Sequence, residues 1–245
     1  MNSILDVSNV SKAFGGIHAL EACSLQVEEG SITGLIGPNG SGKTTLFNVI
    51  TGYERADSGQ IRFRDKDITQ AQPDKVFRAG LGRTFQLTRI FPRLTVIENM
   101  HVAAQRNRGL SLFSGWSSGH EQQRSIELLD FVGLTGLKDM SAGELSYGQK
   151  KLLEFAIILI ADPQVILLDE PAGGINPTMI QHIEERIRIL NQRGITFFIV
   201  EHNMEFVMNI CTTINVLHRG TPIAAGTPEE VRNKPEVLEA YLGGD

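Results

Sequence analysis

The segment that most constrains the fold of this chain is the glycine-rich stretch GPNGSGKTT at positions 37–45. It matches the pattern G-x-x-x-x-G-K-[ST], in which a short loop binds the phosphates of a nucleotide. Gly37, Gly40 and Gly42 allow the backbone to turn sharply and to approach a ligand closely. Residues 31–36 have the pattern of a buried strand, and residues 44–50 that of a helix. This order of strand, loop and helix predicts a phosphate-binding loop rather than a chance match in a glycine-rich turn.

The side chains of the loop extend this prediction to a nucleotide that carries a metal ion. Successive backbone N–H groups in such a loop form a nest that binds anions. Lys43 adds a charge that can reach the β- and γ-phosphates, and the hydroxyl of Thr44 is placed to ligate Mg²⁺. The predicted nucleotide-binding residues of the loop are Gly37, Pro38, Asn39, Gly40, Ser41, Gly42, Lys43, Thr44 and Thr45.

The composition limits the classes of partner. The 245 residues carry 23 basic and 28 acidic side chains, and no basic stripe, so we expect no binding to nucleic acid phosphates. Cys23 and Cys211 cannot form a disulfide framework, and their apolar neighbours indicate small core residues. We find no secretory signal and no apolar run near the ~20 residues that span a bilayer. The chain is therefore expected in the cytosol, or at a membrane only through a partner.

The order of the predicted elements indicates an α/β fold. Residues 4–14 and 20–27 alternate between apolar and polar side chains, as antiparallel strands do. Further strands are predicted at 31–36, 60–63, 82–86, 165–168, 195–200 and 214–217. Helices are predicted at 44–50, 73–79, 95–106, 120–131, 146–160, 177–193, 203–210 and after Thr227. Buried strands separated by helices predict a mostly parallel core sheet covered by helices on both faces.

Polar side chains follow the ends of several predicted core strands, where an open α/β sheet binds its ligands. Asp169 and Glu170 follow four apolar residues, so Asp169 can hold Mg²⁺ and Glu170 can polarise an attacking water. The alternative is that this carboxylate pair caps the next helix. Gln86 can ligate the metal and sense the γ-phosphate, and His202 can contact that phosphate and orient the water. Without the phosphate loop, these two would be interpreted as ordinary surface polar residues.

Two segments remain open to more than one interpretation. Phe14 stands at a strand end before Gly15 and Gly16, where it can stack on an adenine or pack in the core. The phosphate loop favours stacking. Residues 109–119 are rich in glycine and serine but include Leu112, Phe113 and Trp116. They form either a mobile loop with a few anchors or a contact surface for a partner.

Taken together, these motifs resemble the ATP-binding subunit of ABC transporters over essentially the whole chain. The most specific segment is LSYGQ, similar to the family signature Leu-Ser-Gly-Gly-Gln, and its residues are Leu145, Ser146, Tyr147, Gly148 and Gln149. The resemblance implies one ABC ATP-binding domain, residues 1–245, with an antiparallel β region and an inserted helical lobe. The core lobe would comprise about residues 1–87 and 163–245, and the helical lobe about residues 88–162.

Two departures from the family pattern point to a subfamily. Tyr147 replaces the first glycine of the signature, whereas Gly148 keeps the second, so the backbone can still approach a phosphate there. Asn176 stands where many members have an aspartate. These features, with the segments 96–100, 106–109, 169–177 and 239–245, are similar to the subfamily that serves branched-chain amino acid uptake. Urea, short-amide and lipopolysaccharide transporters use closely similar subunits.

The resemblance implies a Mg²⁺-dependent ATPase that powers an importer of branched-chain or other hydrophobic amino acids. Glu170, His202 and Gln86 would be catalytic, and Thr44, Gln86 and Asp169 would hold the metal. The signature would act on the ATP of a second ATP-binding subunit, a copy or a paralogue, in a head-to-tail dimer. Transmembrane permease subunits would hold the chain at the cytoplasmic face, with a solute-binding protein as an indirect partner. The other readings are a soluble ABC protein and a non-catalytic regulator.

Overall fold

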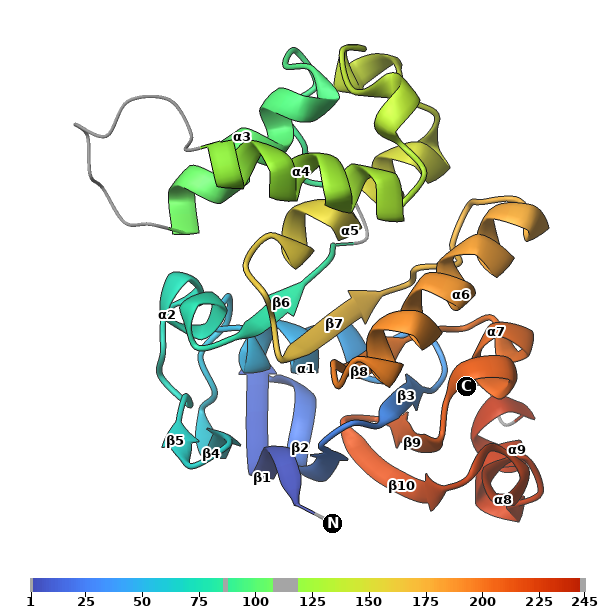
Figure 1. The fold of residues 1–245 in the computed structure, drawn as a ribbon. Coiled ribbons are helices and arrows are strands. Elements are labelled where there is room, and N and C mark those ends of the chain that lie inside the picture. Colours follow the sequence, from blue (N-terminus) through green and yellow to red (C-terminus); the bar gives the residue numbers. More distant parts are fainter. Residues whose placement is uncertain (1, 86–87, 108–118, 243–245) are drawn as a thin grey trace.

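The computed structural model describes residues 2–85, 88–107 and 119–242. Ten strands, nine α-helices and two short 3-10 helices lie within these residues (Figure 1). The helices are α1 (Lys43–Ile50), α2 (Pro73–Arg78), α3 (Val96–Asn107), α4 (Gly119–Phe131), α5 (Tyr147–Leu159), α6 (Pro177–Gln192), α7 (Met204–Ile210), α8 (Pro228–Arg232) and α9 (Pro235–Leu242). None of these described helices combines the length and the apolar character that a membrane span requires.

The central element is a six-stranded sheet in the order β10-β9-β3-β8-β7-β6. Its strands are β3 (Ile32–Ile36), β6 (Leu81–Arg83), β7 (Val165–Asp169), β8 (Thr196–Val200), β9 (Thr213–His218) and β10 (Thr221–Gly226). All neighbouring pairs are parallel except β9 and β10, which form an antiparallel hairpin at the edge. Every residue of β3, β7 and β8 is buried, as expected for strands covered on both faces. The predicted mixed, mostly parallel sheet is confirmed.

A second, four-stranded sheet forms the antiparallel β region, in the order β2-β1-β4-β5. Its strands are β1 (Ser3–Phe14), β2 (Ile17–Glu28), β4 (Ser58–Phe63) and β5 (Lys66–Asp67). Along β2, buried and exposed residues alternate, so one face packs inward and the other meets solvent. The two predicted strands at the N-terminus are therefore confirmed. The short strand β5 was not predicted, because two charged residues carry no apolar alternation.

Side chains of the core sheet point alternately into two apolar clusters. Leu35, Leu167 and Phe198 face the cluster shared with α1 and the antiparallel sheet. Ile166 and Ile199 face the opposite cluster, which includes residues of α3 to α9. The sheet is thus covered on both faces, as the pattern predicted. In Figure 1, α3, α4 and α5 gather together beyond the β6 end of the sheet.

Helix starts follow local signals in the sequence. Thr95 and Glu98 exchange hydrogen bonds in a capping box, with Glu98 N–H donating to Thr95 Oγ1 (3.2 Å). Ser146 and Gln149 form the same motif at α5, and Thr227 and Glu230 form it at α8. These three helices begin within a residue of the predicted positions. The last helix, α9, was not predicted.

Candidate nucleotide-binding site

The phosphate loop connects β3 to α1, as the motif requires, and its glycines are fixed by sterics. A Cβ on Gly37 would lie 2.0 Å from the carbonyl oxygen of Leu217, and one on Gly42 would lie 2.3 Å from that of Ala19. Gly40 has open space around it but a φ of +78°, which favours glycine. The loop is therefore pinned between β9 and β2. Gly220 N–H adds a hydrogen bond to the carbonyl of Ser41 (2.9 Å).

Lys43 folds back over its own loop. Its Nζ donates to the carbonyl oxygens of Gly37 (2.8 Å) and Pro38 (2.9 Å). Burial lowers the pKa of Lys43, while the negative charges of Glu170 and Asp169 raise it. The ammonium therefore lies in the same electrostatic environment as the carboxylates at the end of β7. A triphosphate in the loop offers this ammonium stronger acceptors than two neutral carbonyls.

The structure also shows an unpaired polar atom within the loop. Ser41 is 2 % exposed, and its hydroxyl has no hydrogen-bond partner within the described residues. Thr44 lies in the first turn of α1 with an exposed side chain. The first N–H groups of a helix lack intrahelical partners and favour an anion. Among the described residues, the loop therefore presents the unpaired Ser41 hydroxyl and the start of α1 where a phosphate would lie.

Asp169, the last residue of β7, is buried and paired. Its Oδ2 accepts a hydrogen bond from Arg83 Nη2 at 2.9 Å, and both side chains are 5 % exposed. Arg83 also donates to Asn48 Oδ1 (2.8 Å) and to Thr51 Oγ1 (3.0 Å) on the α1 side. Burial lowers the pKa of Arg83, and Asp169 opposes that effect. Arg83 thus ties β6, α1 and the carboxylate together, a role that the sequence analysis missed.

Glu170 follows Asp169 in an unusual backbone conformation. Its φ is +50°, in the left-handed region that residues other than glycine rarely adopt. Its Oε1 lies 3.7 Å from Nδ1 of His202, whose side chain is 62 % exposed. The ends of β7 and β8 therefore bring these two predicted residues together, as expected. The N-cap of α6 is Asn176, whose side chain accepts a hydrogen bond from Met179 N–H (2.9 Å). The alternative that the carboxylate pair of Asp169 and Glu170 caps that helix is therefore wrong.

Glu201, next to His202, is fully buried and was not predicted as a site residue. Its carboxylate accepts hydrogen bonds from the N–H groups of Ala172 (2.7 Å), His202 (2.9 Å) and Asn203 (3.0 Å). It therefore fixes the backbone of the segment after Glu170 against the loop that carries His202. A sequence signal existed, because Glu201 lies at the same strand end as His202.

The predicted strand at 82–86 is partly wrong, because β6 ends at Arg83. Beyond it, Thr84 still donates its N–H to the carbonyl of Leu167 on β7 (2.9 Å). Phe85 does not continue this pairing with β7. The Phe85 N–H donates to Glu154 on α5 (3.3 Å). Gln86, predicted as a catalytic and metal-binding residue, lies outside the described residues, as does the loop at 109–118.

Phe14 ends β1 at the hairpin with β2 and is 44 % exposed. The interpretation of Phe14 as a core residue is therefore wrong. The ammonium of Lys12 lies 5.1 Å from the centre of its ring. Stacking on an adenine remains a prediction, and the position is compatible with it, since Ala19 of the same hairpin touches the phosphate loop.

The signature residues Leu145–Gln149 lie at the start of α5. Ser146 is the N-cap, its hydroxyl accepting from Gln149 N–H (3.3 Å), while Leu145 is buried in the core. The ring of Tyr147 lies beside Gly174, and Nζ of Lys151 lies 5.3 Å from its centre. A Cβ on Gly148 would lie 3.0 Å from Met179 Cγ of α6. Close helix packing within the chain therefore already accounts for the small residue at Gly148.

The oxygen donors at the end of β7 and the start of α1 fit a magnesium ion. Mg²⁺ prefers oxygen ligands and uses one or two carboxylates together with substrate phosphates. Thr44 contributes a hydroxyl and Asp169 a carboxylate. No group of three or more His, Cys, Asp or Glu residues suited to a metal occurs in residues 2–85, 88–107 and 119–242. A magnesium ion here would therefore depend on phosphate oxygens for much of its coordination.

Together, the sheet topology and the phosphate loop define a nucleotide-binding protein of the phosphate-loop class. The family model described as "ABC transporter" matches residues 20–173. The model "Branched-chain amino acid ATP-binding cassette transporter" matches residues 221–245. A LivG protein of Archaeoglobus fulgidus is 41 % identical, over 98 % of this chain and 95 % of that protein. The "High-affinity branched-chain amino acid transport ATP-binding protein LivG" of Salmonella typhimurium is 39 % identical, over 98 % of both.

Solved structures give the same assignment. The ADP conformation of MJ1267, an ATP-binding cassette of an ABC transporter, superposes with a TM-score of 0.89 at 36 % identity, covering 100 % of both chains. The dimeric ABC transporter cassette MJ0796 gives a TM-score of 0.80 at 25 % identity, over 91 % of this chain and 98 % of that one. The chain belongs to the ABC transporter family, as an ATP-binding, ATP-hydrolysing subunit of the LivG type.

Proposed function

We propose that this chain hydrolyses Mg²⁺-ATP with Glu170 as the base and so powers the import of branched-chain amino acids. The observation that carries the proposal is the approach of Glu170 Oε1 to His202 Nδ1 (3.7 Å), beside the end of β7. The negative charges of Glu170 and Asp169 also act on Lys43, so carboxylates and phosphate loop share one site. Hydrolysis needs such a base beside the γ-phosphate.

In this proposal, different residues of the site bind the nucleotide and catalyse its hydrolysis. Lys43 and the N–H groups at the start of α1 bind and orient the phosphates, and Phe14 stacks on the adenine. The Glu170 carboxylate accepts a hydrogen bond from the attacking water and draws off its proton. His202 donates to the γ-phosphate and keeps the water in line. Gln86, in the segment after β6, ligates the metal and senses the γ-phosphate.

Thr44 and Asp169 are the described residues that would hold Mg²⁺, together with Gln86. The ion would neutralise charge on the β- and γ-phosphates. Because Arg83 binds Oδ2 of Asp169 (2.9 Å), Oδ1 would be the oxygen that ligates the ion. Replacing Asp169 would also leave the buried guanidinium of Arg83 without its carboxylate partner.

We place a second ATP-binding subunit across the site, head to tail, so that Ser146 and Gly148 of each signature close over the other's ATP. The start of α5 supports this arrangement, because Ser146 is exposed there and a helix N-terminus favours phosphate. In this arrangement residues 88–162 form the helical lobe and Asn176 lies near the dimer seam. Permease subunits hold the pair at the cytoplasmic face of the membrane, and a solute-binding protein supplies the amino acid.

The test uses the transporter complex purified through a tag on this chain and reconstituted in vesicles. Glu170→Gln keeps the shape of the side chain and removes its charge. We expect ATP binding to persist and turnover to fall by about 10²–10⁴-fold, the range for loss of a general base. Glu205→Gln, an exposed acid in the first turn of α7, is the matched control and should keep full activity.

The same preparation tests the solute. Leucine, isoleucine and valine should stimulate ATP hydrolysis in the complex, and urea or short amides should not. Unchanged turnover in Glu170→Gln would refute the assignment of the base. Stimulation by another solute class would leave the ATPase assignment intact and would refute the assignment of branched-chain amino acids as the solute.

A further inference from the structure

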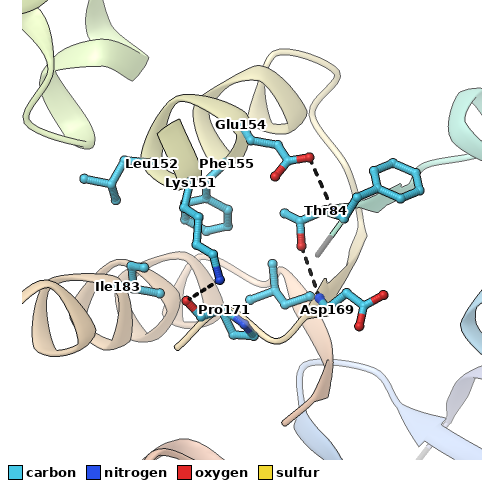
Figure 2. A pocket seen from close by; sticks show the side chains of 10 residues that line it. Thr84, Lys151, Leu152, Glu154, Phe155, Asp169, Pro171 and Ile183 are labelled. Carbon is cyan, nitrogen blue, oxygen red and sulfur yellow. Dashed lines mark hydrogen bonds between the residues drawn. The ribbon is translucent and has the colours of Figure 1, made fainter. Parts of the chain in front are cut away.

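A buried lysine on the signature helix contacts the backbone of the proposed base. Lys151, one turn into α5, is 8 % exposed. Its Nζ donates to the carbonyl oxygen of Glu170 (2.5 Å) and to that of Pro171 (3.3 Å). Figure 2 shows its side chain reaching from α5 to Pro171, across a cavity of about 20 Å³. A lysine is rarely buried unless its charge is paired, and the ammonium of Lys151 is paired with these two carbonyl oxygens.

The backbone that Lys151 holds is the one that aims the Glu170 carboxylate. At a φ of +50°, Glu170 adopts a conformation that costs energy and persists only where the surroundings impose it. Its carbonyl also accepts a hydrogen bond from Gly173 N–H (3.1 Å). A charge-assisted bond from an ammonium is the stronger kind of restraint on a carbonyl. Lys151 therefore fixes the direction from which the Glu170 side chain leaves the backbone.

The charges around Lys151 suit a cation that must stay buried. Burial lowers the pKa of Lys151, and the negative charges of nearby acids oppose that effect; these acids are Glu201, Glu154, Glu170 and Asp169. The ring of Tyr147, with its centre 5.3 Å from Nζ, adds a cation–π contact between Lys151 and a residue of the signature. The ammonium thus connects the start of α5 with the end of β7.

We propose that Lys151 is a positioning residue that holds Glu170 ready for catalysis and links it to the signature of the same chain. This proposal rests on the proposed function, in which Glu170 serves one ATP and the signature closes over the other. A shift of the signature on its phosphate would reach Glu170 through α5 and Lys151. The two ATP sites of a dimer would then be connected through each chain.

The test compares Lys151→Met with Lys151→Arg in the purified transporter complex. Methionine keeps an unbranched side chain of similar length but has no donor, whereas arginine keeps donors for the two carbonyls. For Lys151→Met we expect kcat to fall by about 10–100-fold, the effect of a small misplacement of a reacting group. The KM for ATP should stay within about twofold of that of the wild type, because the ATP contacts are untouched. Lys151→Arg should recover at least part of kcat.

Lys150→Met is the matched control, since it removes the neighbouring lysine from the same turn of α5. It should keep the kcat of the wild type. A second measurement is the ATP retained by the complex after gel filtration in a Glu170→Gln background. Adding Lys151→Met to that background should not reduce the retained ATP, because the signature still closes. If Lys151→Met does not assemble, Lys151→Leu, a shorter side chain that also lacks a donor, replaces it.

Two results would overturn the proposal. One is a kcat for Lys151→Met equal to that of the wild type. The other is a parallel loss of kcat, of ATP retention and of the rescue by arginine, which would make Lys151 a packing residue of the lobe. Neither result touches the proposed function, which fails only if the wild-type complex hydrolyses no ATP or Glu170→Gln keeps full turnover.

Discussion

Glu154, one turn after Lys151, makes the stability of this protein depend on pH in a way that can be measured. It is 4 % exposed, and its Oε1 accepts hydrogen bonds from the N–H groups of Phe85 (3.3 Å) and Arg89 (3.2 Å). In Figure 2 it extends from α5 to the chain beside Thr84. Burial raises the pKa of Glu154 to about 7, although the two backbone N–H groups and the charges of Lys151 and Arg89 lower it.

The sign of the effect follows from proton binding. Between the ordinary pKa of 4.5 and the folded value of about 7, the folded chain binds a proton that the unfolded chain has lost. The free energy of unfolding therefore falls as pH rises through this window and levels off above it. Because one pH unit is worth about 1.4 kcal/mol, the loss between pH 5 and pH 8 is roughly 2–3 kcal/mol.

The variant Glu154→Gln isolates the contribution of Glu154 to the pH dependence of the free energy of unfolding. Glutamine keeps an oxygen that can accept from the two backbone N–H groups, and it cannot ionise. In urea unfolding, the wild type should lose roughly 2–3 kcal/mol relative to the variant between pH 5 and pH 8. Glu144→Gln, an exposed acid just before α5, should follow the wild type at every pH. A constant difference between wild type and Glu154→Gln across this range would refute a raised pKa at Glu154.

Two further predictions concern the phosphate loop. Lys43→Ala should weaken ATP binding about 10–100-fold, since a charge-assisted contact contributes about 1.5–3 kcal/mol, and equal affinities by calorimetry would contradict this. Gly37→Ala should destabilise the chain by more than about 3 kcal/mol, because its Cβ would lie 2.0 Å from the Leu217 carbonyl oxygen. Gly40→Ala, with open space at its Cβ, should cost only about 1 kcal/mol of backbone strain. Equal midpoints in thermal unfolding for the two alanine variants would show that crowding at Gly37 is not the cause.

The elements that the sequence predicted well are those with local causes. The capping box of Ser146 and Gln149 fixes the start of α5 from four adjacent residues. Asn176 and Pro177 do the same for α6, whose N-cap bond is present. Apolar strands that end on polar residues brought Glu170 and His202 to one edge, since parallel strands share a direction. Each of these features needs only the periodicity and the chemistry of one short segment.

What the sequence could not predict depends on contacts between distant segments. Lys151 and Glu154 lie one turn apart on a helix, where charged residues normally face water. Lys151 is buried against the segment after β7, and Glu154 against the segment after β6. Arg83 lies at the end of a short strand, and nothing near it in sequence indicates its ion pair with Asp169. The early end of β6 has the same origin, because Phe85 donates its N–H to α5 instead of to a strand.

Tyr147 bears on the proposal that the signature of this chain closes over a phosphate, because it replaces a glycine of the family signature. Its side chain lies against Gly174 and the ammonium of Lys151, along the side of α5. The first N–H groups of α5 and the exposed Ser146 remain at the helix start. Gly148 keeps α5 close to α6, where Met179 would meet any larger side chain. The aromatic ring therefore strengthens the link from the signature to Lys151, and through it to Glu170, without covering the end of the helix that favours an anion.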